Sequence, residues 1–355
     1  MRSAVGFAIL IAMDETNEQD NAMIPAMRFA RVIASTTYPI VSAYEFEFLQ
    51  EEKIIRERFG SSTIYIIAQR PLTYFDNVVY EATNIWFEIA DGNGTPLPCR
   101  IDLAENGICE VGEILELEIG FHSDTPNCQQ PHRNVGGFKL YRENGEFVLW
   151  WSPQKFLYEM LVNGLKVYVG EEADPYAFLD FRIHYIGQSF SQKVWDRLTG
   201  HTKMQKILTR ERELGSAPEA RAPFEISLII LQITGVDDIP LIGADADHPL
   251  AGSNPIVFSL DSNDESAFER FMSTPRVQLG DEALTRELEA FLIHRFKPTY
   301  NEVLFANYPN IIGGMRSKGY SSTEFILERL PAFLYTDNYS MVSAVSELGD
   351  QDRER

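Results

Sequence analysis

Five polar residues in the second half of the chain have side chains that could together hydrolyse a phosphodiester bond. An arginine fork matches two phosphate oxygens and keeps its charge at any working pH, and a lone glutamate suits a hard cation such as Mg²⁺. Tyrosine and histidine can move protons, and asparagine can support the site. In chain order the five are Tyr185, Arg197, His201, Glu289 and Asn301.

The order and spacing of these residues resemble a known pattern. Tyr185 begins a Tyr-Ile-Gly triplet, in which Gly187 permits a close approach of the backbone. Arg197 and His201 are four positions apart, so on a helix they share one face. The triplet, the Arg-x-x-x-His pair, the later Glu and the later Asn resemble the motifs of the GIY-YIG nuclease superfamily. The resemblance covers roughly residues 164–305.

The resemblance implies a small antiparallel sheet flanked by helices and an endonuclease that cleaves DNA with Mg²⁺ or Mn²⁺. Glu289 is expected to hold the metal ion, and Arg197 to stabilise the phosphate in the transition state. Tyr185 and His201 are expected to assist proton transfer and orientation. Asn301 is expected to support the site.

The first tyrosine motif of the family departs from its pattern in this chain. The strand before the Tyr-Ile-Gly triplet contains Lys166-Val167-Tyr168, with lysine where the family has glycine. Gly164 stands two positions too early, and Tyr176 follows a loop-like Asp-Pro pair. The resemblance implies that the first tyrosine is the general base, which makes Tyr168 the expected base. The lysine favours the alternative of a fold that has lost catalysis.

Each of these residues also has a purely structural explanation. Arg197 and His201 could be an exposed pair on a basic helix, and a tyrosine in a strand ordinarily serves packing. Glu289 could be a solvated helix residue like Glu287 beside it, and Asn301 could close a turn after a proline. Only the ordered set, taken together, favours the nuclease interpretation.

Charge is distributed unevenly along this chain of 355 residues. A formal charge of −21 is unusual for a nucleic-acid-binding protein. Residues 193–212, however, carry six Lys or Arg against two acids, a local net charge of +4, whereas residues 234–265 hold seven acids and no Lys or Arg. The sequence therefore predicts selective contact with double-stranded DNA beside the motif. Three residues are expected there: Gly187, Lys203 and Lys206.

Cysteine usage and hydropathy predict a cytoplasmic protein without a membrane segment. Three cysteines are a low, odd number, which argues for a reducing compartment. The apolar run Ala4–Met13 lacks a convincing cleavage site, which favours a first β-strand over a signal peptide. No apolar run reaches the about 18 residues that span a bilayer.

The first 155 residues are β-rich in pattern and form the first of two expected domains. Short apolar or alternating blocks predict strands, and an Asn-Gly pair between the last two predicts a hairpin turn. One amphipathic stretch predicts a helix over residues 45–59. The expected strands cover residues 62–69, 80–90, 113–121, 137–142 and 146–151.

A Ser-Pro pair near residue 153 marks the boundary to the nuclease-like domain, expected over residues 156–310. A third part, 311–355, is expected to form a helix near 322–333 and a charged tail. The predicted fold class is α+β, a GIY-YIG-like sheet flanked by helices and preceded by the β-rich domain. Periodicity predicts helices over 154–162, 194–213 and 281–296, and strands over 165–169, 181–186 and 224–233.

The sequence thus predicts a metal-dependent endonuclease, with restriction or anti-phage defence as its role by analogy. One alternative is a protein that keeps the fold, binds nucleic acid and has lost catalysis. Another is a structural or sensor protein whose function lies in the N-terminal domain. That domain is also the expected surface for a protein partner or for homo-oligomer formation.

Overall fold

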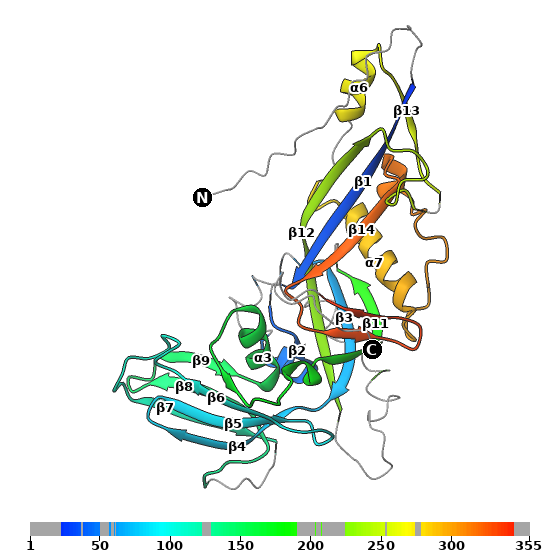
Figure 1. The fold of residues 1–355 in the computed structure, drawn as a ribbon. Helices are drawn as coiled ribbons and strands as arrows, with labels where there is room; N and C mark the ends of the chain where they lie inside the picture. The colour runs from blue at the N-terminus through cyan, green and yellow to red at the C-terminus, as the bar shows by residue number, and fades with distance from the viewer. Residues whose placement is uncertain are drawn as a thin grey trace.

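The strands of the protein form two sheets that lie side by side in the computed structural model (Figure 1). The chain is a sheet-rich α+β protein. The structure describes residues 23–36, 38–49, 57, 60, 62–122, 129–189, 203, 207, 224–252, 254–273 and 278–343.

The larger sheet has nine strands within the described residues, in the order β13-β1-β12-β3-β11-β15-β16, with β14 beside β1 and β2 beside β12. Its strands come from the beginning, the middle and the end of the chain. They are β1 (Met23–Thr36), β2 (Val41–Ser42), β3 (Ile64–Pro71), β11 (Asp180–Gln188), β12 (Phe224–Ile242), β13 (Phe258–Asp261), β14 (Ser322–Glu328), β15 (Phe333–Tyr335) and β16 (Ser340–Val342).

Strand β3 lies between β11 and β12 and is antiparallel to both. All five residues from Ile64 to Ala68 are completely buried. A strand that is buried on both faces needs a continuous apolar run, and Ile-Tyr-Ile-Ile-Ala supplies one. The sequence of β3 therefore suits the centre of a sheet.

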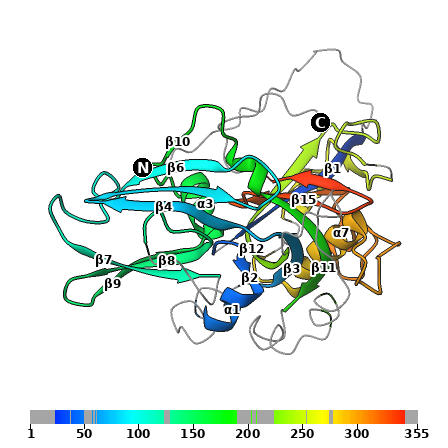
Figure 2. The ribbon, with the colours of Figure 1, turned by 90° about the horizontal axis from the view of Figure 1, so that it is seen from below.

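The smaller sheet has seven strands within the described residues, in the order β10-β6-β5-β4-β8-β7, with β9 beside β8. It uses one continuous part of the chain, and Figure 2 shows β10 and β7 at opposite sides of it. Its strands are β4 (Tyr74–Glu81), β5 (Asn84–Ala90), β6 (Leu97–Asp102), β7 (Leu115–Phe121), β8 (Val135–Arg142), β9 (Phe147–Trp151) and β10 (Tyr168–Val169).

The two longer helices are capped by the residues that flank them. The Ser152 side chain accepts from the Lys155 backbone N–H at the start of α3, and the Asp281 side chain accepts from the Ala283 N–H at the start of α7. Lys297 ends α7 in the left-handed region at φ 46°. The helices are α1 (Ala43–Leu49), α3 (Pro153–Val162), α6 (Glu265–Met272) and α7 (Glu282–Phe296), with short 3₁₀ turns η1 (Pro175–Phe178) and η2 (Met315–Lys318).

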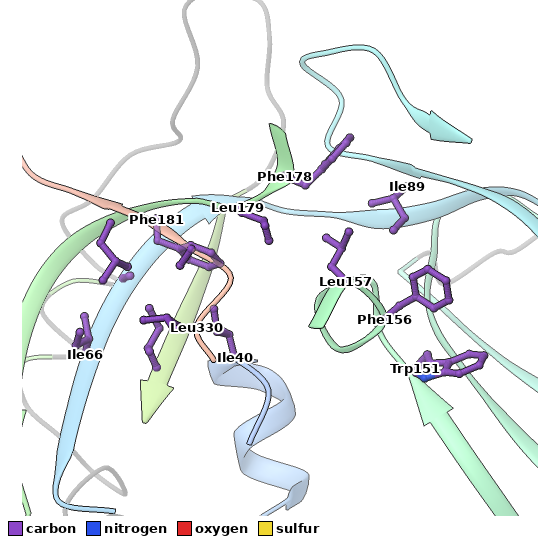
Figure 3. Packing of buried hydrophobic residues seen from close by; sticks show 14 of the residues in the cluster. Ile40, Ile66, Ile89, Trp151, Phe156, Leu157, Phe178, Leu179, Phe181 and Leu330 are labelled. Carbon is purple, nitrogen blue, oxygen red and sulfur yellow. The ribbon is translucent and has the colours of Figure 1, made fainter. Parts of the chain in front are cut away.

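One hydrophobic core joins the two sheets. Phe156 and Leu157 of α3 lie against the smaller sheet, and the cluster continues without a break to Ile66 and Phe181 of the larger one (Figure 3). Phe156 is 4.9 Å from Phe87 between ring centroids, in an edge-to-face arrangement. Because apolar surface is shared across the junction, the two sheets are packed as one body.

The strands do not divide at residue 155, where the sequence predicted a domain boundary. Strands β1, β2 and β3 precede that residue yet belong to the larger sheet with β11 and β12. The smaller sheet is an insertion between β3 and β11. Strands β11 and β12, for which the resemblance implied a small antiparallel sheet, belong to a nine-stranded sheet that also contains the parallel pairs β1–β14 and β11–β15.

The prediction of a C-terminal helix near residues 322–333 is wrong. Residues 322–328 form β14, parallel to β1, and residues 333–335 form β15, parallel to β11. The spacing of the apolar residues in this segment is compatible with a helix and with a strand. The segment forms strands because it pairs with the edges of β1 and β11. Strand β12 extends past the predicted end at 233 to Ile242, because it stays paired with β1 through Ala26.

Most other predicted elements are confirmed near their expected bounds. Strands β3, β5, β7, β8, β9 and β11 and helices α3 and α7 overlap the predicted ranges. Gly145 has φ 81° in the turn between β8 and β9, as an Asn-Gly hairpin requires. The expected first strand Ala4–Met13 lies outside the described residues, as do the greater part of the 45–59 helix and all but two residues of the 194–213 helix.

The helices of the described ranges are all too short or too polar to cross a membrane.

A buried ion pair holds the acidic end of β12 against β1. The Arg28 guanidinium binds the Asp238 carboxylate, and their side chains are 2% and 9% exposed. Arg28 also donates to the Phe271 carbonyl at 3.1 Å and lies over the Tyr320 ring. Asp238 belongs to the acidic region 234–265, and its carboxylate is buried because β1 supplies the counter-charge.

We expect Asp238→Ala to lower the free energy of unfolding by about 3–5 kcal/mol, because it leaves Arg28 buried without its counter-ion. Chemical denaturation measures this loss. The matched control is Glu324→Ala, which breaks the exposed pair of Arg31 on the same strand and should cost less than about 1 kcal/mol. An equal loss of unfolding free energy in the two variants would contradict the conclusion that the buried Arg28–Asp238 pair stabilises the fold more than an exposed pair does.

Candidate functional site

The pairing of β3 with β11 places two tyrosines together. Gly187 lies opposite Tyr65 in the register, and Tyr185 lies opposite Ile67. The rings of Tyr65 and Tyr185 are 6.0 Å apart between centroids and tilted by 36°. Both side chains lie on the face of the sheet that is covered by the second hydrophobic cluster, which includes Phe46 of α1.

Gly187 makes room for these two rings. A Cβ atom at this position would lie 2.6 Å from the Tyr65 hydroxyl and 2.8 Å from the Tyr185 ring. Such distances are far inside van der Waals contact, so any side chain here would push the rings away. The glycine of the Tyr-Ile-Gly triplet therefore has a packing role, because it leaves space for the two tyrosine rings.

Asn301 holds the outer edge of β11 at this level. Its side-chain oxygen accepts from the Ile186 N–H at 3.0 Å, and its side-chain NH₂ donates to the Ile186 carbonyl at 2.8 Å. The Tyr300 N–H donates to the His184 carbonyl at 3.1 Å. Residues 300 and 301 thus continue the ladder beyond β15, which pairs only with residues 180–182. Asn301 does more than close a turn.

His184 of β11 forms a second polar contact, with Gln69 of the neighbouring strand β3. Its Nε2 lies 2.7 Å from the Gln69 side-chain oxygen, and both residues are buried. The His184 ring also meets Tyr300 edge to face at 5.9 Å. The pair links β11 to β3 and supports the segment that carries Asn301.

Helix α7 carries Glu289 along the other face of the sheet. Leu288 and Leu292 of α7 are buried in the shared core. Thr285 donates to the Thr63 hydroxyl at 3.4 Å, just before β3. Glu289 follows Thr285 by four positions on the same stripe of the helix and is half-buried. Glu289 therefore lies one helical turn beyond Thr285, on the face of the sheet opposite Tyr65 and Tyr185.

The sequence suggested that Glu287 is a solvated helix residue, but the structure buries it. It is 1% exposed, and its carboxylate accepts from the Met315 N–H at 3.2 Å. Burial raises the pKa of Glu287 to about 7. Turn η2 covers this side of α7, which the periodicity of the helix alone did not indicate.

Lys203 lies beside the Asn301 segment. Its ammonium forms an ion pair with Glu302 at 2.5 Å. Ile207, four residues later, is completely buried in the same cluster as Tyr65. Ile207 therefore packs on the tyrosine face of the sheet. Three predicted site residues lie outside the described residues: Arg197, His201 and Lys206.

Tyr168 is not part of this arrangement. It lies in β10, opposite Arg100 of β6, in the smaller sheet, and is 49% exposed. Its hydroxyl donates to Glu105 at 2.8 Å, and this hydrogen bond raises the pKa of Tyr168. A raised pKa keeps the proton on the phenol, the opposite of what a general base needs. The expected convergence of Tyr168 with Tyr185 is contradicted, because β11 takes β3 as its antiparallel neighbour.

Sequence reasoning missed Tyr65. It stands in Thr63-Ile64-Tyr65, 120 positions before Tyr185, whereas the resemblance pointed to the strand immediately before Tyr185. The Ile-Tyr pair in a strongly apolar strand was the available signal. Only the pairing of β3 with β11 makes it meaningful.

Glu289 is the carboxylate that the resemblance assigns to the metal ion. Among the described residues, no group of three or more His, Cys, Asp and Glu side chains could enclose a metal ion. Mg²⁺ keeps several waters and is held by as few as one or two carboxylates, so the single half-buried Glu289 fits that ion better than zinc.

Comparison of the chain with protein-family models, with curated proteins and with solved structures gives no match.

We expect Gly187→Ala to lower the free energy of unfolding by about 1–3 kcal/mol, because the new methyl group overpacks the two tyrosine rings. Urea denaturation measures the change. Gly120→Ala in β7 is the control, since its nearest contact would be an ordinary 3.5 Å. Combining Gly187→Ala with Tyr65→Leu should recover part of the loss, and additive losses would count against the close contact.

Proposed function

We propose that the protein is a metal-dependent endonuclease that hydrolyses phosphodiester bonds in double-stranded DNA, with Tyr65 in the role first given to Tyr168. The resemblance of the Tyr185, Arg197, His201, Glu289 and Asn301 set to the GIY-YIG nucleases supports the proposal. The role in restriction or anti-phage defence and the cytoplasmic location remain parts of the proposal.

One observation carries the proposal. The central strand β3 brings a tyrosine against the Tyr-Ile-Gly strand, with Tyr65 over Gly187 and 6.0 Å from Tyr185. Asn301, the last residue of the resemblance, binds the backbone of the middle residue of that triplet. Residues that lie far apart in sequence thus occupy neighbouring positions on one strand pair.

The proposed chemistry divides among these side chains. Tyr65 takes the proton of the attacking water, and Tyr185 orients the water or the phosphate. Arg197 binds two phosphate oxygens, His201 assists proton transfer, and Asn301 keeps β11 in place. The resemblance assigns the Mg²⁺ or Mn²⁺ ion to the Glu289 carboxylate, where it would supply positive charge to the phosphate. Helix α7 carries Glu289 on the face of the sheet opposite the two tyrosines, and this placement counts against the metal assignment.

The proposed DNA contact lies on the side of Lys203. The surplus of basic residues between 193 and 212 favours phosphate there, together with Lys206 and the backbone at Gly187. The acidic remainder of the chain repels DNA elsewhere. This charge distribution supports a nuclease that engages DNA at one place.

Tyr65→Phe should reduce Mg²⁺-dependent nicking of supercoiled plasmid by about 10²–10⁴-fold while DNA binding persists, because only the proton-carrying hydroxyl is removed. Tyr185→Phe should reduce it less. Rates of conversion from supercoiled to open circular DNA measure cleavage, and gel shift in EDTA measures binding.

Tyr168→Phe is the matched control, since Tyr168 lies in the other sheet, and it should nick at the normal rate. Loss of nicking in Tyr168→Phe, or full activity in Tyr65→Phe, would overturn the reassignment of the base.

Glu289→Gln should reduce nicking by more than about 10²-fold, because it removes the charge that holds the metal ion. The half-buried amide should leave the fold intact, which circular dichroism checks. Glu282→Gln on the same helix is the control, because Glu282 is exposed and pairs with Arg286. If Glu289→Gln nicks DNA at the normal rate at every Mg²⁺ concentration, Glu289 does not hold the metal ion.

A second candidate is a nucleic-acid-binding protein without catalysis. The observation that favours it is the complete burial of Tyr65, because a base must reach water or the substrate. The nicking assay separates the two functions: binding in EDTA without cleavage in Mg²⁺ or Mn²⁺ by the unmodified protein would select the second.

A further inference from the structure

Strand β7 is an edge of the smaller sheet. Its seven residues pair with β8 from Leu115↔Arg142 to Phe121↔Val135, and no other described strand pairs with β7. Figure 2 shows β7 at the border of the sheet away from β10. Edge strands present unpaired backbone N–H and C=O groups, and β7 contains no proline or lysine that would block pairing.

Two carboxylates and two aromatic rings share one exposed face at this edge. Glu116 lies opposite Tyr141, and Tyr141 lies opposite Phe147 of β9. Both glutamates of β7, Glu116 and Glu118, are exposed, and Phe147 is 51% exposed. The Tyr141 and Phe147 rings are 5.8 Å apart between centroids. Carboxylates beside aromatic rings suit a cationic side chain.

The surface at this edge is also hollowed and apolar. A shallow depression of about 380 Å³ is lined by Glu116, Leu117, Glu118, Tyr141 and Gly145. Just before β7, Val111 and Ile114 are 89% and 65% exposed. Exposed apolar side chains next to an open edge are typical of an interaction surface.

From these features we infer that β7 binds an extended, basic segment of a partner protein by β-strand addition. The backbone of β7 pairs with the segment, and its lysine or arginine side chains lie against Glu116 and Glu118, the exposed carboxylates of the adjacent strand. Charge complementarity selects this partner. Between residues 74 and 151 the sequence holds thirteen Asp or Glu and four Lys or Arg, and Glu118 already binds Lys139 in this way at 3.1 Å.

The same charges disfavour a second copy of the chain at this edge. In an antiparallel pair of β7 strands related by a twofold axis at Leu117, Glu116 of each copy lies directly opposite Glu118 of the other. Like charges that face each other across strands are destabilising. The partner is therefore a segment of opposite charge.

The test uses the full-length protein and a fluorescein-labelled nine-residue peptide of alternating lysine and valine, followed by anisotropy. We expect binding that weakens with salt and slowed amide exchange in β7. A peptide with glutamate in place of lysine should not bind. A peptide with the same lysines but proline in place of valine should bind at least about tenfold more weakly, since proline cannot donate to the ladder.

Charge reversal locates the site. Glu116→Lys with Glu118→Lys should weaken binding at least about tenfold, whereas Glu81→Lys with Glu171→Lys, an equal change at other exposed positions, should not. If the first pair fails to fold by circular dichroism, Glu116→Gln with Glu118→Gln replaces it.

Three results would overturn the proposal. They are equal weakening by both charge reversals, equal binding of the proline peptide, and exchange protection outside β7. A concentration-dependent dimer that protects β7 would assign the edge to a second copy instead. Each of these measurements is independent of nuclease activity.

Discussion

The pairing of β3 with both β11 and β12 is the constraint on which the rest of the structure depends. From Ile64 to Ala68 the strand is buried on both faces, so it must have neighbours on both edges and apolar layers above and below. This requirement fixes α7 on one face and α1 with Ile207 on the other. Tyr65 then has no place except over Gly187.

The insertion of the smaller sheet between β3 and β11 does not disturb this pairing, because the two sheets share one core. Arg70, at the end of β3, is buried at the junction. It donates to the Phe178 carbonyl at 3.1 Å, binds Glu225 of β12 at 3.3 Å and lies over the Phe181 ring. A buried guanidinium needs all of these partners, so the junction has a single defined geometry.

Charge separates the two surfaces that the molecule offers. Asn301 binds the edge of β11 and Lys203 pairs with Glu302 beside it, whereas the edge of β7 carries Glu116 and Glu118. Phosphate is attracted to the first and repelled by the second. Under the proposed functions, nucleic acid and a basic polypeptide would bind this protein of net charge −21 at different places.

The sequence by itself determined the strongly periodic elements and the local turns, because apolar spacing and caps such as Ser152 and Asp281 act over a few residues. It singled out Gly187 and Asn301 through the resemblance, although their structural partners, Tyr65 and Ile186, lie more than a hundred positions away from them in the sequence. It could not identify Tyr65, since the partner of β11 comes from 120 positions earlier and nothing local records it. It placed Tyr168 wrongly and made residues 322–333 a helix for the same reason. Strand pairing over long sequence distances is decided by burial and by which edges stay open, and those exist only in the tertiary structure.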